Sequence, residues 1–181
     1  MQAVGADRPE EGIVGRVASY LGARTGRPVH LTNLARGGAT IKQVLERQLP
    51  EADLQRADLV LVVTSNDLEK RVPLETYRAD LQSFLASLPA DRTVVSDLPL
   101  MPGRKGYQQI LEAETDSLGV VRADFATVFS RARRLDIFSW LLPHLNSQGY
   151  ALWFEAFRPS VANMAAQVQL KAGAKPLGGT S

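Results

Sequence analysis

The strongest indication of the fold is the run Leu59-Val60-Leu61-Val62-Val63, followed by Thr64-Ser65-Asn66-Asp67. The first part is continuously apolar and favours a β-strand, which is typical of a strand buried on both faces of a parallel sheet. We therefore predict a strand at the centre of a sheet. Asn and Asp directly after a strand also form ordinary turns, because their side chains can bond their own backbone. The stretch thus predicts a buried strand that ends in a polar turn.

Helices and strands alternate along the rest of the chain. The predicted helices cover residues 10–24, a segment carrying Ile41 to Leu49, a segment carrying Tyr77 to Leu88, residues 107–115, and a helix from Ser147 that Asn146 is placed to cap. The other predicted strands are Val29 to Leu34, Thr93 to Ser96 and Gly119 to Asp124, and Pro159 is expected to start a further helix. This order predicts a three-layer α/β/α fold with a mostly parallel, doubly wound, flavodoxin-like sheet.

The length and composition indicate one globular domain. A chain of 181 residues supports a single full core, and we expect one domain at residues 1–168 with a flexible tail at 169–181, where Gly, Lys and Pro are frequent. No apolar run approaches the roughly 20 residues that a membrane-spanning helix needs. Because no secretory signal is visible in the sequence as given, we expect a cytoplasmic protein without a membrane span.

Charge and residue counts exclude several classes of function. The net charge is only +2, and no aromatic residues interleave with the one basic cluster, Arg131, Arg133 and Arg134, so we expect no nucleic-acid partner. The chain has no cysteine and only two histidines, His30 and His144, which excludes thiolate chemistry and makes a metal site implausible. We therefore expect no cofactor, and we interpret His30 as structural.

Three polar turns carry the candidate chemistry. Gly38 offers a backbone N–H at the start of a predicted helix, Asn66 offers a side-chain amide, and His144 can exchange a proton near neutral pH. A doubly wound sheet brings such turns to one edge. Each turn also has a simpler reading: Gly37-Gly38 as a permissive turn, Asn66-Asp67 as a strand end, and His144 as a surface or capping residue.

The order of these turns resembles the SGNH, or GDSL-like, hydrolase family. The stretch from Asn33 to Thr40 is similar to the glycine block of that family, Ser65-Asn66-Asp67 to most of its asparagine block, and His144 to Tyr150 to its histidine block. The resemblance covers nearly the whole chain. It implies an ester or acyl hydrolase acting on a small or lipid-like ester, in which a serine attacks, His144 is the general base, and Gly38 and Asn66 hold the oxyanion.

The chain also departs from that family pattern. Thr64 stands where the family has glycine, Leu141 where it has the triad aspartate, and Leu145 where it has proline. Asp136 could replace the missing aspartate from upstream, or the site could work as a dyad. Residues 140–142 could line an acyl pocket or simply belong to the core.

The family's Gly-Asp-Ser block is not among these residues. Gln2 to Ala6 resembles the segment just after that block, so we expect the serine immediately upstream of Met1, together with the first strand of the sheet. Two alternatives stay open. The chain could be a catalytically inactive binding or scaffold domain of the same fold, or a partner chain could supply the missing strand in an oligomer.

Overall fold

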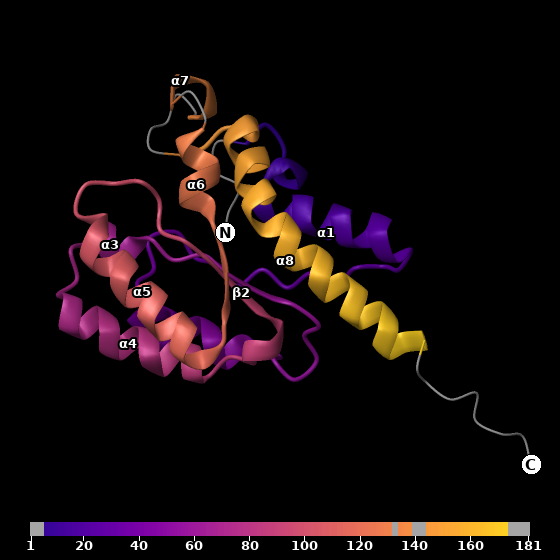
Figure 1. Cartoon of the computed structure of the whole chain (residues 1–181), viewed down its shortest axis with the longest axis horizontal. Coiled ribbons are helices and arrows are strands. Elements are labelled where there is room, and N and C mark those ends of the chain that lie inside the picture. The colour runs from indigo at the N-terminus through magenta and orange to yellow at the C-terminus, as the bar shows by residue number, and fades with distance from the viewer. Residues whose placement is uncertain (1–5, 132–133, 139–143, 174–181) are drawn as a thin grey trace, which may run out of the picture.

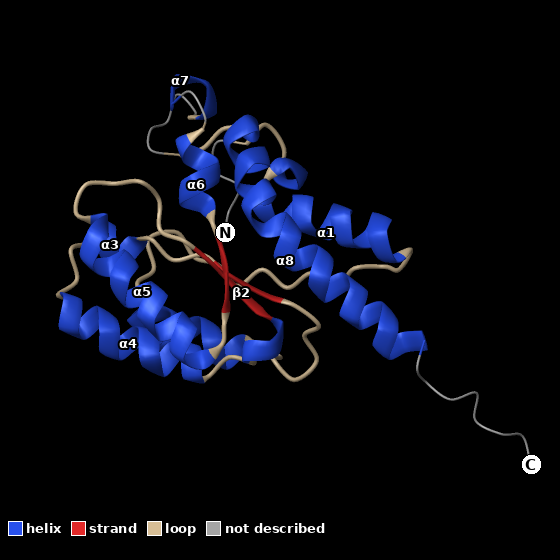
Figure 2. Cartoon of the chain, in the orientation of Figure 1, coloured by secondary structure: helices blue, strands red, loops and turns tan. Residues whose placement is uncertain are grey.

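The computed structural model describes residues 6–131, 134–138 and 144–173 (Figures 1 and 2). The three strands are β1 (Val60–Val62), β2 (Thr93–Ser96) and β3 (Val121–Ala123). The α-helices are α1 (Ile13–Thr25), α2 (Ile41–Gln43), α3 (Asn66–Glu69), α4 (Leu74–Ala86), α5 (Arg104–Leu118), α6 (Phe125–Ser130), α7 (Arg134–Ile137) and α8 (Ser147–Gly173). Four single turns of other helix types are η1 (Pro9–Glu11), η2 (Val44–Gln48), η3 (Leu49–Glu51) and η4 (Ala90–Arg92).

The strands form a parallel sheet in the order β1-β2-β3. Leu61 pairs with Val94, and Val95 pairs with Arg122. All of β2 is buried, as expected for the strand with a neighbour on each side. The apolar run at residues 59–63 does form a strand, but the prediction that it lies in the centre is wrong, because β1 is an edge of the described sheet.

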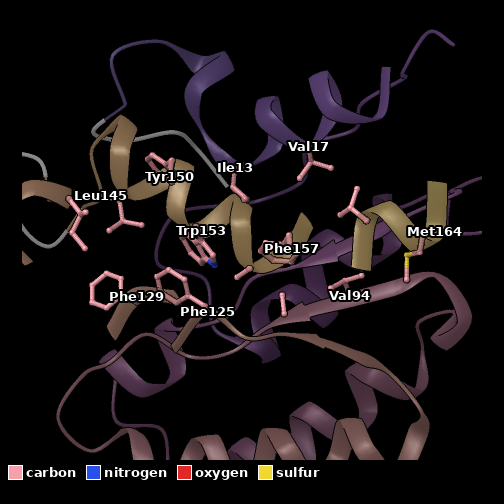
Figure 3. Packing of buried hydrophobic residues seen from close by; sticks show 14 residues of the cluster. Ile13, Val17, Val94, Phe125, Phe129, Leu145, Tyr150, Trp153, Phe157 and Met164 are labelled. Atoms are coloured by element: carbon pink, nitrogen blue, oxygen red, sulfur yellow. The ribbon is translucent and has the colours of Figure 1, made fainter. Parts of the chain in front are cut away.

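Helices cover both faces of the sheet and produce the predicted three layers (Figure 2). On one face, α1, α6 and α8 pack over Val94, and Figure 3 shows Trp153 and Phe157 of α8 at the centre of this cluster. On the other face, α4 and α5 pack over Val95 together with Ile41 of α2. Because Val94 and Val95 are neighbours on one strand, the alternation of side chains along β2 places one in each core.

Helix α8 runs without a break through Pro159, so the prediction that a further helix starts there is wrong. Val161 and Met164, beyond the proline, are buried against the same cluster as Phe157 before it. Continued burial of this face against α1 and the sheet outweighs the backbone hydrogen bond that a proline inside a helix removes. α8 continues to Gly173, past the domain boundary predicted at residue 168.

The predicted strand from Val29 to Leu34 is absent, since these residues belong to no helix or strand. Val29 and Leu31 are 38% and 55% exposed, and His30, predicted to be structural on this strand, is exposed as well. A strand requires a neighbouring strand to satisfy its backbone groups, and none of the described strands pairs with this segment. Its apolar side chains are therefore left at the surface. No helix within the described residues is long and apolar enough to cross a membrane.

Candidate active site

The glycine turn places Gly38 at the exposed tip of a loop before α2. Ala39 N–H donates to the carbonyl of Arg36 at 3.3 Å, and Gly38 has a φ of +74°, which is the third position of a type II turn. A side chain at Gly38 would meet no atom within 4 Å, so glycine is required by the backbone conformation and not by lack of space. Thr40 then caps α2 in a reciprocal bond with Gln43, so Gly38 lies two residues before the cap.

The asparagine turn follows β1 and is bonded directly to the glycine loop. Asn66 Nδ2 donates to the carbonyl of Ala39 at 2.8 Å, and Ile41 N–H donates to Asp67 Oδ2 at 3.0 Å. Two consecutive residues of one turn therefore hold both sides of Thr40. The structure thus places Gly38, on the loop before α2, near Asn66, the first residue of α3, beyond the carboxyl end of β1.

Asp67 is a buried carboxylate, only 2% exposed. Burial raises the pKa of this carboxyl above its ordinary value, while the bond from Ile41 N–H acts in the opposite direction. The pKa of the neighbouring Tyr77 hydroxyl is also raised, first by burial and then by the charge of Asp67. Asp67 Oδ1 and the Tyr77 hydroxyl oxygen each have no hydrogen-bond partner within the described part of the chain. The sequence analysis places Asp67 in a turn and in the asparagine block but assigns it no role, because a buried, bonded carboxylate has no signature in a single sequence.

His144 lies exposed on a separate segment, just before an isolated antiparallel bridge between Phe138 and Leu145. Asn146 fixes this segment, because its Nδ2 donates to the carbonyl oxygens of Asp136 at 2.8 Å and Phe138 at 3.2 Å. Its Oδ1 accepts from Gly149 N–H, which confirms Asn146 as the cap of α8. Among the described residues, no hydrogen bond joins His144 to Gly38 or Asn66.

The start of the described chain is bonded to the histidine segment. Asp7 N–H donates to Ser147 Oγ at 3.1 Å, and Ser147 Oγ also lies 2.5 Å from Glu11 Oε2. Arg16 donates to the carbonyl of Ser147 at 3.0 Å. The residues before α1 therefore lie against the first turn of α8, three positions after His144. Residues 140–142, interpreted as an acyl pocket or core, lie outside the described residues.

A polar cavity of about 310 Å³ lies at the carboxyl ends of β2 and β3, lined by Asp97, Glu112, Arg122 and Asp124. Burial raises the pKa of the Asp97 carboxyl, which accepts from Gln108 at 2.9 Å. Arg122 lies 3.9 Å from Asp97 Oδ1 through its Nε, donates to Thr115 Oγ1 at 2.7 Å and pairs with Asp116. The charged and polar groups of this cavity therefore form hydrogen bonds and ion pairs with one another beside the edge strand β3. Within the described ranges no cluster of His, Cys, Asp or Glu could hold a metal ion.

Three solved structures share this fold at 17% sequence identity each. One is LAE5, an alpha/beta hydrolase enzyme from the metagenome of Lake Arreo, Spain, with a TM-score of 0.71, covering 85% of this chain and 83% of that one. The psychrotrophic esterase EstA from Pseudoalteromonas has a TM-score of 0.67, covering 86% of this chain and 88% of its own. A putative lipolytic protein of the G-D-S-L family from Desulfitobacterium hafniense DCB-2 has a TM-score of 0.66, covering 86% and 90%. The chain therefore shares its fold with these three proteins.

The sequence comparison assigns the family. The model of the GDSL-like lipase/acylhydrolase family matches residues 1–152, which is most of the chain. The chain belongs to this family, and the resemblance found in the polar turns is confirmed. No match was found among curated proteins.

Proposed function

We propose that the protein is a serine hydrolase of small or lipid-like esters, with Gly38 N–H and the Asn66 amide as oxyanion donors and His144 as general base. The observation that carries the proposal is the 2.8 Å bond from Asn66 Nδ2 to the Ala39 carbonyl, within a chain of the GDSL-like family. That bond uses one of the two N–H groups of the amide, so the other is free to donate to a substrate oxygen. Gly38, one residue before Ala39, supplies the second donor.

The reaction then follows from the chemistry of these groups. A serine hydroxyl attacks the ester carbonyl carbon while His144 removes its proton, and the carbonyl oxygen becomes an oxyanion held by the two donors. The tetrahedral intermediate expels the alcohol, which takes the proton from His144. Water, activated by the same imidazole, hydrolyses the acyl-serine and releases the acid.

The serine in this proposal comes from a segment upstream of Met1. Two observations support that placement. The bonds of Asp7 and Glu11 to Ser147 hold the early residues beside the first turn of α8, close in sequence to His144. The outer edge of β1 also has no strand paired to it within the described residues, and a first strand leading to the serine would satisfy that edge.

The group that orients His144 is part of the same proposal. Leu141, which stands at the position of the family's aspartate, lies outside the described residues. Asp136 is the acidic residue that Asn146 ties to the histidine segment, through the 2.8 Å bond to its carbonyl oxygen. We expect Asp136 to orient the imidazole, or His144 to act with the serine as a dyad.

The test compares ester hydrolysis by the 181-residue chain and by a longer protein that includes the upstream segment. With a short-chain aryl ester, turnover is expected only in the longer protein and is lost in its His144→Ala variant. The matched control is His30→Ala, which removes the other exposed histidine and should leave turnover unchanged. A folded longer protein without turnover would contradict the proposal and favour an inactive binding or scaffold domain of this fold.

A further inference from the structure

Asp67 occupies an unusual place beside the proposed oxyanion donors. It is the next residue after Asn66, and its carboxylate accepts the Ile41 N–H at 3.0 Å, while Asn66 donates to Ala39. The loop that follows Gly38 is therefore held at two points, one residue on each side of Thr40. Two bonds fix both the position and the orientation of a short loop, whereas one bond leaves it free to rotate about that contact.

The loop is otherwise held by an exposed ion pair between Arg36 and Glu51 and by the cap of Thr40 on α2. Gly37 and Gly38 are exposed, and the bond from Ala39 N–H to the Arg36 carbonyl lies within the turn itself. The asparagine turn, in contrast, is held by hydrogen bonds to residues that follow it in the chain. Val72 N–H donates to the Asp67 carbonyl at 2.9 Å, and the Tyr107 hydroxyl donates to the Val72 carbonyl. Asp67 thus connects a firmly held turn to an exposed loop.

Burial of a carboxylate at this position is unfavourable in free energy. Desolvation disfavours its charged form, the nearby Asp80 adds repulsion, and Oδ1 gains no hydrogen bond within the described residues. An apolar side chain would avoid that cost but would leave the buried Ile41 N–H without its acceptor. The carboxylate is therefore explained by the bond through which it holds Ile41 and, with it, the end of the loop.

We propose that Asp67 is a positioning residue, which holds the Gly38 loop through Ile41 N–H so that Gly38 N–H and the Asn66 amide face one oxyanion. This inference rests on the proposed function, because it assigns Asp67 a part in that same site. It acts through the loop and touches no substrate. Loss of the bond should therefore displace the Gly38 donor and lower kcat, with little change in KM.

The first arm of the test measures loop geometry in the 181-residue protein by NMR. In Asp67→Ala, faster hydrogen exchange at Ile41 N–H and shifted Gly38 and Asn66 side-chain amide signals are expected. Asp67→Asn keeps an acceptor and should restore all of these signals to their wild-type positions. Asp80→Asn is the matched control, because it removes a nearby charge without touching the loop. Unchanged Gly38 and Asn66 signals in Asp67→Ala would overturn the proposal.

The second arm measures kinetics in the longer protein, normalised to the concentration of active sites. Asp67→Ala should lower kcat by about 100-fold, the usual cost of a misplaced catalytic group, and Asp67→Asn should rescue it. Equal kcat in Asp67→Ala and wild type would contradict the proposal. If the alanine variant does not fold, the test depends on Asp67→Asn. A kcat well below that of the wild type, or faster hydrogen exchange at Ile41 N–H, would then overturn the inference. A wild-type protein without turnover is a failure of the proposed function, and the NMR arm still reports on the loop.

Discussion

The two parts of the candidate site are held in place in different ways. The oxyanion part consists of Gly38 and Asn66. Two hydrogen bonds, from Asn66 to the Ala39 carbonyl and from Ile41 N–H to the buried Asp67, join the loop that carries Gly38 to α3. The histidine part is an exposed residue at the end of one bridge, positioned by Asn146 and by the first turn of α8. The two blocks of the family are therefore supported separately, one at the edge of the sheet and one by a helix cap. Substitutions in the two supports should therefore have separable effects.

The largest effect is expected for Gly149→Ala in the histidine part. A Cβ at this position would meet the carbonyl oxygen of Ile137 and lie 2.9 Å from Leu145 Cβ, so backbone must move. We expect a loss of about 3 kcal/mol in the free energy of unfolding, at the upper end for overpacking. Urea denaturation measures it, with the exposed neighbour Gln148→Ala as control. A loss of unfolding free energy smaller than that of the control would mean that Gly149 is not packed tightly against Ile137 and Leu145.

The next effect tests the cap that supports His144. Asn146→Ala removes the bond to Gly149 N–H and both donations to the carbonyls of Asp136 and Phe138. A loss of about 2 kcal/mol is expected, the upper range for an N-cap. Hydrogen exchange should rise in residues 136–138 and stay unchanged at Ile41. Faster exchange at Ile41 as well would show that the two parts of the site are not independent.

A smaller effect is expected in the oxyanion part from Gly38→Ala. The positive φ strains an alanine, at a cost of about 1 kcal/mol, whereas space is open around the position. Gly38→Asn should cost less, because asparagine tolerates this backbone region. Thermal unfolding of both variants checks the difference. Equal losses for Ala and Asn would mean that the loop relaxes out of this conformation.

The smallest effect is a pH dependence that belongs to Asp67. Its pKa is raised in the folded protein above the ordinary value of 3.8, mainly by burial, so the group stabilises the fold below that value. This stabilisation is lost as pH rises through the raised pKa. Asp67→Asn should remove the effect, so that its unfolding free energy, relative to wild type, increases from acidic to neutral pH. Asp80→Asn serves as a control, and parallel pH curves for wild type and Asp67→Asn would contradict the burial of a charged Asp67.

The sequence predicts elements well where local pattern decides them. The strand from Thr93 to Ser96 and the capping of α8 by Asn146 are both confirmed. Val29 to Leu34 has an equally suitable composition but forms no strand, because pairing depends on a neighbour that local sequence does not reveal. The prediction that a new helix starts at Pro159 is wrong for a related reason, because the burial of residues on both sides of the proline depends on tertiary packing. The domain boundaries and the cytoplasmic location stay predictions.

The candidate site shows the same limit. The polar turns and their order identify the family, but the bond from Asn66 to Ala39 links residues 27 positions apart. Burial of Asp67 likewise depends on α4 packing beneath it, through Tyr77. Such contacts form only when the chain folds, and no local pattern in a single sequence predicts them.

The most direct measurement of the central claim is a crystal structure of the longer protein after reaction with a short-chain alkyl phosphonate ester. We expect a phosphonate attached to a serine upstream of Met1, with its oxygen about 3 Å from both Gly38 N and Asn66 Nδ2 and with His144 beside the serine. A phosphonate oxygen held by other groups, or His144 turned away from the labelled serine, would show that these residues do not form the active site.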